Sequence, residues 1–160
     1  MCRRSYVYLF AGFLVGIVVL VAGGYLGLQR QLIVETESPL SFDNTVQAIT
    51  TVANDNGWKV PKVYKLCKSL RKHNYKLRPV AVIELCKPDY AAKLLSSDDT
   101  RLVSSFMPCR ISVYEKANGN VIVSRMNTSL VSRLFQGDIS EVMELATLET
   151  QQILNQALIK

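Results

Sequence analysis

The residues best suited to chemistry in this chain of 160 residues are the ones that carry sulfur. Cys86 and Cys109 each lie at one end of a predicted strand, within two residues of a proline. They are candidates for a disulfide if the domain faces an oxidising compartment. With the nearby thioether of Met107, they would also suit a soft metal ion such as Cu(I). A zinc site would need a third thiol such as Cys67, and the spacing does not support one. The alternative is that all three cysteines are small buried hydrophobes.

Whether the two thiols meet depends on how their strands pair. If the strands are antiparallel neighbours, the end of the first lies beside the start of the second, and the sulfurs are close. If the strands are parallel, Cys86 and Cys109 lie at opposite ends of the sheet, about 20 Å apart for a strand of ~7 residues. The connection over residues 87–108 is long enough for a helical crossover, which counts against the pair.

Signatures of known catalytic machinery are absent from the sequence. The single histidine, His73, excludes metal sites that need two histidines. There is no H-E-x-x-H, no G-x-S-x-G, no phosphate-binding loop and no dinucleotide fingerprint. Glu84, in an apolar strand, is expected to face outward or to pair with Arg110 across the sheet. The sequence therefore favours a binding or accessory module over an enzyme, and it indicates no cofactor apart from Cu(I).

The charge of the chain is concentrated near its start. The net charge is +6, but Arg3, Arg4 and Arg30 supply three of the positive charges. In residues 31–160, 16 basic residues face 13 acidic ones. So mild an excess does not indicate nucleic-acid binding.

No charged residue occurs between Arg4 and Arg30, and residues 6–28 are long enough for a membrane-spanning helix of ~20 residues. A cleaved signal peptide is the alternative, but the apolar run exceeds the usual signal core of ~7–15 residues. Arg3 and Arg4 before the segment, against Arg30 alone after it, place the N-terminus in the cytoplasm. The prediction is a single-pass protein of the inner (cytoplasmic) membrane with its C-terminal domain outside the cytoplasm.

Four glycines form a stripe along this predicted helix. Gly12, Gly16, Gly23 and Gly27 are spaced 4, 7 and 4 residues apart and fall within about 60° of one another on a helix. Small residues at such spacing let two membrane helices approach closely. They predict a homodimer or a membrane-protein partner, and the alternative is the ordinary frequency of glycine in such helices.

A second helix is predicted from Pro61 to about Asn74, with a basic face opposite its apolar one. The face would be solvated or would contact anionic lipid or an acidic partner. Its residues are Lys62, Lys65, Lys68, Arg71 and Lys72.

The remaining elements predict a small α+β domain, with an antiparallel or mixed sheet packed with helices. A helix begins after Ser41 and ends at Asn56-Gly57, and a strand over residues 79–86 reads as an interior one. A short helix follows at 88–95. The segment 109–116 pairs with 121–123 through the Asn118-Gly119 turn, and residues 138–158 form an amphipathic helix. The chain thus divides into a membrane anchor, 1–30, and an α+β domain, 31–160.

Several blocks resemble domain-of-unknown-function family 302. They are Ser41 to Val60 with its Asn-Gly-Trp, Val82 to Leu95 with Glu-Leu-Cys-Lys-Pro-Asp-Tyr, and Met107 to Lys116 followed by Asn-Gly-Asn-Val. The resemblance, over about residues 33–158, implies a compact α+β sandwich that is often dimeric and sometimes follows a membrane helix. It implies no chemistry. The family commonly has Asn before the proline of the strand-to-helix turn, where this chain has Lys87.

These observations predict a membrane-anchored, extracytoplasmic binding or accessory module of unknown ligand. The alternative is a thiol-based redox or soft-metal-handling protein that uses Cys86 and Cys109.

Overall fold

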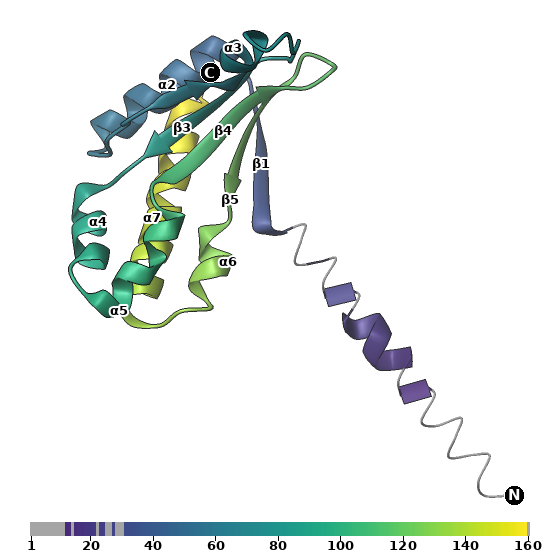
Figure 1. Ribbon diagram of the computed structural model, residues 1–160, viewed down its shortest axis with the longest axis vertical. Coiled ribbons are helices and arrows are strands. Elements are labelled where there is room, and N and C mark those ends of the chain that lie inside the picture. The colour runs from purple at the N-terminus through teal and green to yellow at the C-terminus, as the bar shows by residue number, and fades with distance from the viewer. Residues whose placement is uncertain (1–11, 14, 22, 25–26, 28–30, 160) are drawn as a thin grey trace, which may run out of the picture. The chain divides into compact units, whose positions relative to one another are not determined.

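The structure of the chain is a computed structural model that describes residues 12, 13, 15–21, 23, 24, 27 and 31–159. The chain divides into two compact units, Met1–Leu32 and Ile33–Lys160. The second unit is an α+β domain with one five-stranded antiparallel sheet, in the order β1-β5-β4-β3-β2 (Figure 1).

The predicted transmembrane helix is wrong. Within the described residues, no helix combines the length and the apolar character needed to cross a membrane. A span needs about 20 consecutive apolar residues in one helix. The predicted inner-membrane location, with the domain outside the cytoplasm, rested on that span and is wrong with it.

The sheet follows from alternating sequence patterns. Its strands are β1 (Ile33–Ser38), β2 (Val63–Lys65), β3 (Val80–Leu85), β4 (Cys109–Glu115) and β5 (Val121–Met126). The predicted interior strand over 79–86 is confirmed, because β3 pairs with β2 on one side and β4 on the other. The predicted turn between β4 and β5 is also confirmed, and Gly119 adopts the positive φ of +87° that such a turn favours.

Two long helices, α2 (Phe42–Asp55) and α7 (Gly137–Ala157), contact each other and cover one face of the sheet (Figure 1). The apolar stripe of α7 is buried as predicted, including Ile139, Val142 and Ile153. On the sheet, the alternate residues Ala81, Ile83 and Leu85 of β3 are fully buried against these helices. The core is therefore a single layer between the sheet and the α2–α7 pair.

The predicted helix from Pro61 to Asn74 is wrong in its first half. Val63, Tyr64 and Lys65 form β2, paired with Ile83, Val82 and Ala81, and only α3 (Leu66–Arg71) is helical. The β-branched and aromatic pair Val63-Tyr64 suits an extended chain, and pairing with β3 satisfies its backbone. The predicted basic face is accordingly split, because Lys62 and Lys65 lie outside α3.

Short helices gather where β3 ends and β4 begins. The chain leaves β3 into α4 (Pro88–Leu95), confirmed as predicted, and continues through α5 (Asp98–Arg101) and the 3-10 helix η1 (Leu102–Phe106). After β5, α6 (Thr128–Ser132) leads to α7. A second cluster of buried side chains, including Leu94, Val103 and Met143, joins α4 and η1 to α7. This end of the domain is where the candidate site lies.

Candidate functional site

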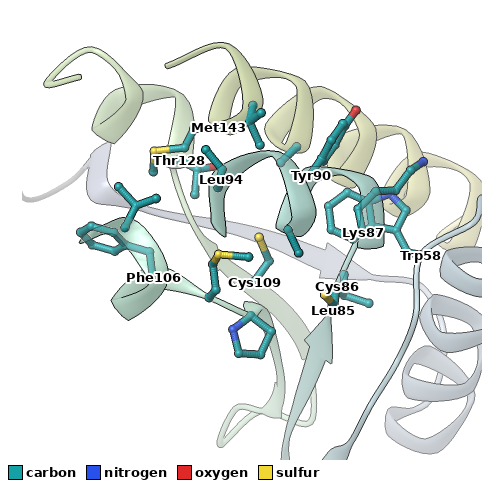
Figure 2. A pocket seen from close by; sticks show the side chains of 16 residues that line it. Trp58, Leu85, Cys86, Lys87, Tyr90, Leu94, Phe106, Cys109, Thr128 and Met143 are labelled. Atoms are coloured by element: carbon teal, nitrogen blue, oxygen red, sulfur yellow. The ribbon is translucent and has the colours of Figure 1, made fainter. Parts of the chain in front are cut away.

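A cavity opens at the junction of β3, β4, α4, η1 and α7 (Figure 2). Its volume is about 60 Å³, measured as the space open to the centre of a water-sized sphere. About 10–15 Å³ of such space suffices for one water, so the cavity has room for several waters or a small organic group.

The lining of the cavity is mostly apolar and comes from distant parts of the chain. Cys86, Met107 and Cys109 come from the ends of β3 and β4, and Lys87 and Tyr90 come from the start of α4. Trp58 comes from the loop after α2, and Thr128 from the start of α6. The other lining residues are apolar: Leu85, Ala91, Leu94, Val103, Phe106, Pro108, Val142, Met143 and Ala146. An apolar hollow with a few polar groups along it is typical of a small-molecule site.

A polar cluster centred on Glu149 of α7 contacts one side of this cavity. The indole N–H of Trp58 donates to Oε2 of Glu149 at 2.8 Å, and Nζ of Lys87 donates to the same oxygen at 2.9 Å. The hydroxyl of Tyr90 donates to Oε1 at 2.6 Å. Three donors from two segments, the loop after α2 and the start of α4, therefore satisfy one half-buried carboxylate.

The cluster changes the acid–base behaviour of its members. Burial works to raise the pKa of Glu149, but hydrogen bonds from Tyr90, Lys87 and Trp58 outweigh it and hold that pKa below its ordinary value. Burial, together with the hydrogen bond to Glu149, raises the pKa of Tyr90 to about 12. At neutral pH the site therefore presents a carboxylate and a neutral phenol.

Aromatic packing fixes the shape of the same side of the cavity. The rings of Trp58 and Tyr90 meet edge to face, with centroids 6.1 Å apart. Nζ of Lys87 lies 5.9 Å from the Trp58 centroid and 5.8 Å from the Tyr90 centroid. Glu149 and the two rings hold the ammonium group of Lys87. Lys87 is therefore part of a polar wall of the cavity and is not a free nucleophile.

The structure settles how the strands of the predicted thiol pair are arranged. β3 and β4 are antiparallel, with Leu85 opposite Cys109, so Cys86 lies one residue beyond the position opposite Cys109 (Figure 2). Both residues and Met107 line the cavity. Cys67, Cys86 and Cys109 are free cysteines, so the structure does not contain the predicted disulfide. Burial, and then the proximity of Cys86, raise the pKa of the Cys109 thiol, so it is protonated at neutral pH.

Other predicted residues lie away from this cavity. Glu84 and Arg110 face each other across β3 and β4, with Nη2 and Oε1 3.4 Å apart, which confirms the predicted pair. In the described part of the chain, no three His, Cys, Asp or Glu side chains gather as a possible metal site. The positions of Cys67, Cys86 and Cys109 therefore do not support a zinc site.

The two predicted contact surfaces remain predictions. The stripe of Gly12, Gly16, Gly23 and Gly27 lies in the first unit, where a Cβ built on each glycine meets no atom within 4 Å. Of the basic residues, Lys65 forms an ion pair with Asp43 at 3.0 Å, and Lys62 lies over the ring of Tyr64 at 4.8 Å. Lys68 and Arg71 are exposed on α3, and Lys72 follows it.

Sequence reasoning missed the Glu149 cluster. The available signal was the position of Glu149 on the apolar stripe of α7, at helical spacing from Val142, Ala146 and Ile153. A carboxylate on a buried stripe needs donors, but no local pattern says that Trp58, Lys87 and Tyr90 supply them. Arg125 is also a charged residue in line with buried apolar ones, because it alternates with Val121 and Val123 on β5.

Comparison with known proteins adds a family and a fold. Residues 34–160 match the family described as domain of unknown function DUF302. The crystal structure of the uncharacterized conserved protein DUF302 from Bacillus stearothermophilus is similar, with a TM-score of 0.70 and 20% sequence identity. The match covers 79% of this chain and 98% of that one, and at this identity it shows the fold alone. None of the curated proteins matches. Because the family match spans most of the chain, this protein belongs to the DUF302 family, as the sequence blocks predicted.

Proposed function

We propose that this domain is a binding module for a small, mostly apolar molecule, which it holds in the cavity between α4, η1 and α7. The observation that carries the proposal is the cavity itself: an apolar hollow beside one satisfied polar cluster. Apolar cavities of this kind stay poorly hydrated and take up apolar ligands. The Trp58–Lys87–Tyr90–Glu149 wall would orient the ligand by its shape.

The only tryptophan of the chain makes the proposal directly testable. Trp58 lines the cavity and is 1% exposed, so its fluorescence should respond to an occupant. Titration of the full-length protein with 1-butanol, 1-hexanol and 1-octanol should give a saturable change, with affinity rising as the chain lengthens to fill the cavity. Each added methylene that is buried contributes about 0.8 kcal/mol.

Two substitutions on the same helix separate the cavity from the surface. Ala91 lines the cavity, whereas its neighbour Ala92 is exposed and does not. Ala91→Leu should fill the space and weaken 1-hexanol binding severalfold, while Ala92→Leu should leave it unchanged. The absence of a saturable signal with any of the three alcohols, in fluorescence and in calorimetry, would refute the proposal.

A soft-metal site is a second candidate, favoured by one observation. Four sulfur-bearing residues, Cys86, Met107, Cys109 and Met143, are among those that line the cavity. Thiolate and thioether sulfur are the ligands that Cu(I) prefers. The raised pKa of Cys109 disfavours a reactive thiolate, which weakens the redox form of this candidate.

Competition for Cu(I) against a coloured chelator tests the metal candidate. The wild type should withdraw one equivalent, Cys86→Ser and Cys109→Ser should lose most of that capacity, and Cys67→Ser should keep it. If Cys67→Ser loses as much capacity as the two cavity variants, the copper is not bound specifically in the cavity and the candidate fails.

A further inference from the structure

Arg125 occupies a place where a charged side chain is unexpected. It lies on β5 in alternation with Val121 and Val123, which are 6% and 1% exposed, and it pairs in register with the buried Ile111 of β4. Its side chain therefore projects from the face of the sheet that α7 covers. A charge on this face needs partners, because moving it out of water is expensive.

The partners of Arg125 do not neutralise it. One terminal nitrogen, Nη2, donates to the amide oxygen of Gln151 at 2.5 Å. The Nε–H is buried and has no hydrogen-bond partner among the described residues. No ion pair joins Arg125 to a carboxylate in that part of the chain, and burial lowers the pKa of the guanidinium. A half-buried guanidinium without an anion, with one orphaned donor, is an incomplete arrangement.

A second cavity lies beside this guanidinium. Its volume is about 150 Å³, and Arg125 lines it together with the hydroxyl-bearing residues Ser105, Thr128 and Thr150. No acidic side chain of the described residues lines it. The other arginine on its wall, Arg110, already faces Glu84. This cavity thus offers the guanidinium of Arg125 to an incoming anion, while the hydroxyls of Thr128 and Thr150 are already hydrogen-bonded within the protein.

The second cavity adjoins the apolar one. Phe106, Pro108, Cys109 and Thr128 line both, so the two spaces share one wall. The proposed ligand would have its apolar part in the first space and a polar end in the second, with the shared residues beside it.

We propose that the ligand is an organic anion, a carboxylate on a short apolar chain, whose carboxylate binds Arg125 while its chain fills the cavity beside Trp58. The inference rests on the proposed function and names the chemical class of the ligand. A planar carboxylate matches the fork of donors that a guanidinium presents, and Nε with one terminal nitrogen is one edge of that fork.

The test compares two probes of the same shape on the full-length protein. Hexanoate and hexanamide differ in charge but hardly in size, and both are measured by Trp58 fluorescence and by calorimetry at neutral pH. Hexanoate should bind about tenfold more tightly, because the guanidinium then faces a charged acceptor in place of a neutral one. This comparison needs no variant and so does not depend on whether a substitution folds.

Variants then locate the charge. Arg125→Gln should remove the preference for hexanoate over hexanamide, because it removes the charge and leaves the apolar cavity intact. Arg133→Gln removes the same charge from an exposed residue of neither cavity and should keep the full preference. A thermal unfolding curve for each variant confirms that it folds.

The outcomes separate the inference from the proposed function. If hexanamide and 1-hexanol bind but hexanoate binds no more tightly, or if Arg133→Gln loses as much preference as Arg125→Gln, the assignment of an anion to Arg125 is overturned and the apolar site stands. If none of the three probes binds, the proposed function itself fails.

Discussion

At the scale of single residues, one carboxylate organises the site. Glu149 receives hydrogen bonds from Trp58, Lys87 and Tyr90, which lie 91, 62 and 59 residues away in the sequence. The contacts tie α7 to the loop after α2 and to the start of α4. Replacing the carboxylate by an amide leaves the three donors with a weaker acceptor. It also leaves the Lys87 ammonium without its ion-pair partner.

The Glu149→Gln substitution should therefore destabilise the fold by about 1–3 kcal/mol at neutral pH, the range for hydrogen bonds to a charged group. Because the folded chain lowers the pKa of Glu149, its contribution is complete above the ordinary carboxyl value of about 4.5 and is lost as the pH falls through the folded pKa. The difference between wild type and variant in urea unfolding should accordingly shrink in acid.

Glu141→Gln on the same helix is the matched control. Glu141 is 59% exposed and pairs with Lys93, so its loss should change the unfolding free energy by less than about 0.5 kcal/mol. Equal effects of the two substitutions, or a Glu149→Gln deficit that does not change with pH, would contradict the role given to Glu149.

Cys109 carries a second prediction at this scale. Because burial raises the pKa of its thiol, iodoacetamide should modify it severalfold more slowly than it modifies glutathione at neutral pH, as followed by mass spectrometry of the peptide. Saturating 1-hexanol should slow the reaction of Cys109 further, because Cys109 lines the cavity. It should not slow the reaction of Cys67, because Cys67 does not line the cavity. Reaction of Cys109 at the rate of glutathione would restore the case for redox chemistry.

At the scale of elements, the β4–β5 hairpin depends on its turn. Gly119 has a φ of +87°, and its amide donates to the carbonyl of Lys116 at 3.0 Å. The amide of Lys116 in turn donates to the carbonyl of Asn120 at 2.9 Å. This turn holds β5 in register, and β5 carries Arg125.

Gly119→Ala should lower the free energy of unfolding by about 1–2 kcal/mol, because an L side chain disfavours positive φ. Gly24→Ala is the same substitution at a helical glycine that has open space and no positive φ, and it should not destabilise the protein. A Gly119→Ala protein as stable as wild type would mean that the turn adopts another conformation in solution.

At the scale of the whole molecule, the second unit contains its own core. Every residue of the two buried clusters described lies between Val46 and Ala157, and the first strand starts at Ile33. Deleting residues 1–30 should leave the free energy of unfolding within about 0.5 kcal/mol of that of the full chain. Deleting residues 1–38 removes β1 and exposes the edge of β5, so that variant should lose most of its stability or aggregate. Similar losses in both deletions would show that the first unit supports the fold.

The sequence by itself determined those elements whose signals are local. The helix over 88–95 begins with a proline at its first position, the hairpin at Asn118-Gly119 has turn residues, and the stripe of α7 has helical spacing. The pairing of Glu84 with Arg110 was one of two alternatives that the sequence offered, and the register of β3 and β4 selected it. The family blocks were specific enough to name DUF302 before any fold was known.

Only the tertiary structure decided what depends on neighbours far along the chain. The apolar residues around Val63–Lys65 recur at helical spacing. The segment is nevertheless a strand, because its backbone hydrogen-bonds to the edge of β3. The hydrophobic segment near the start matched a membrane span by composition, and the described structure contains no such helix. The cavity, the Glu149 cluster and the orphaned Arg125 arise where β3, β4, β5 and α7 meet. Their residues come from separate segments, and no local pattern in the sequence encodes that meeting.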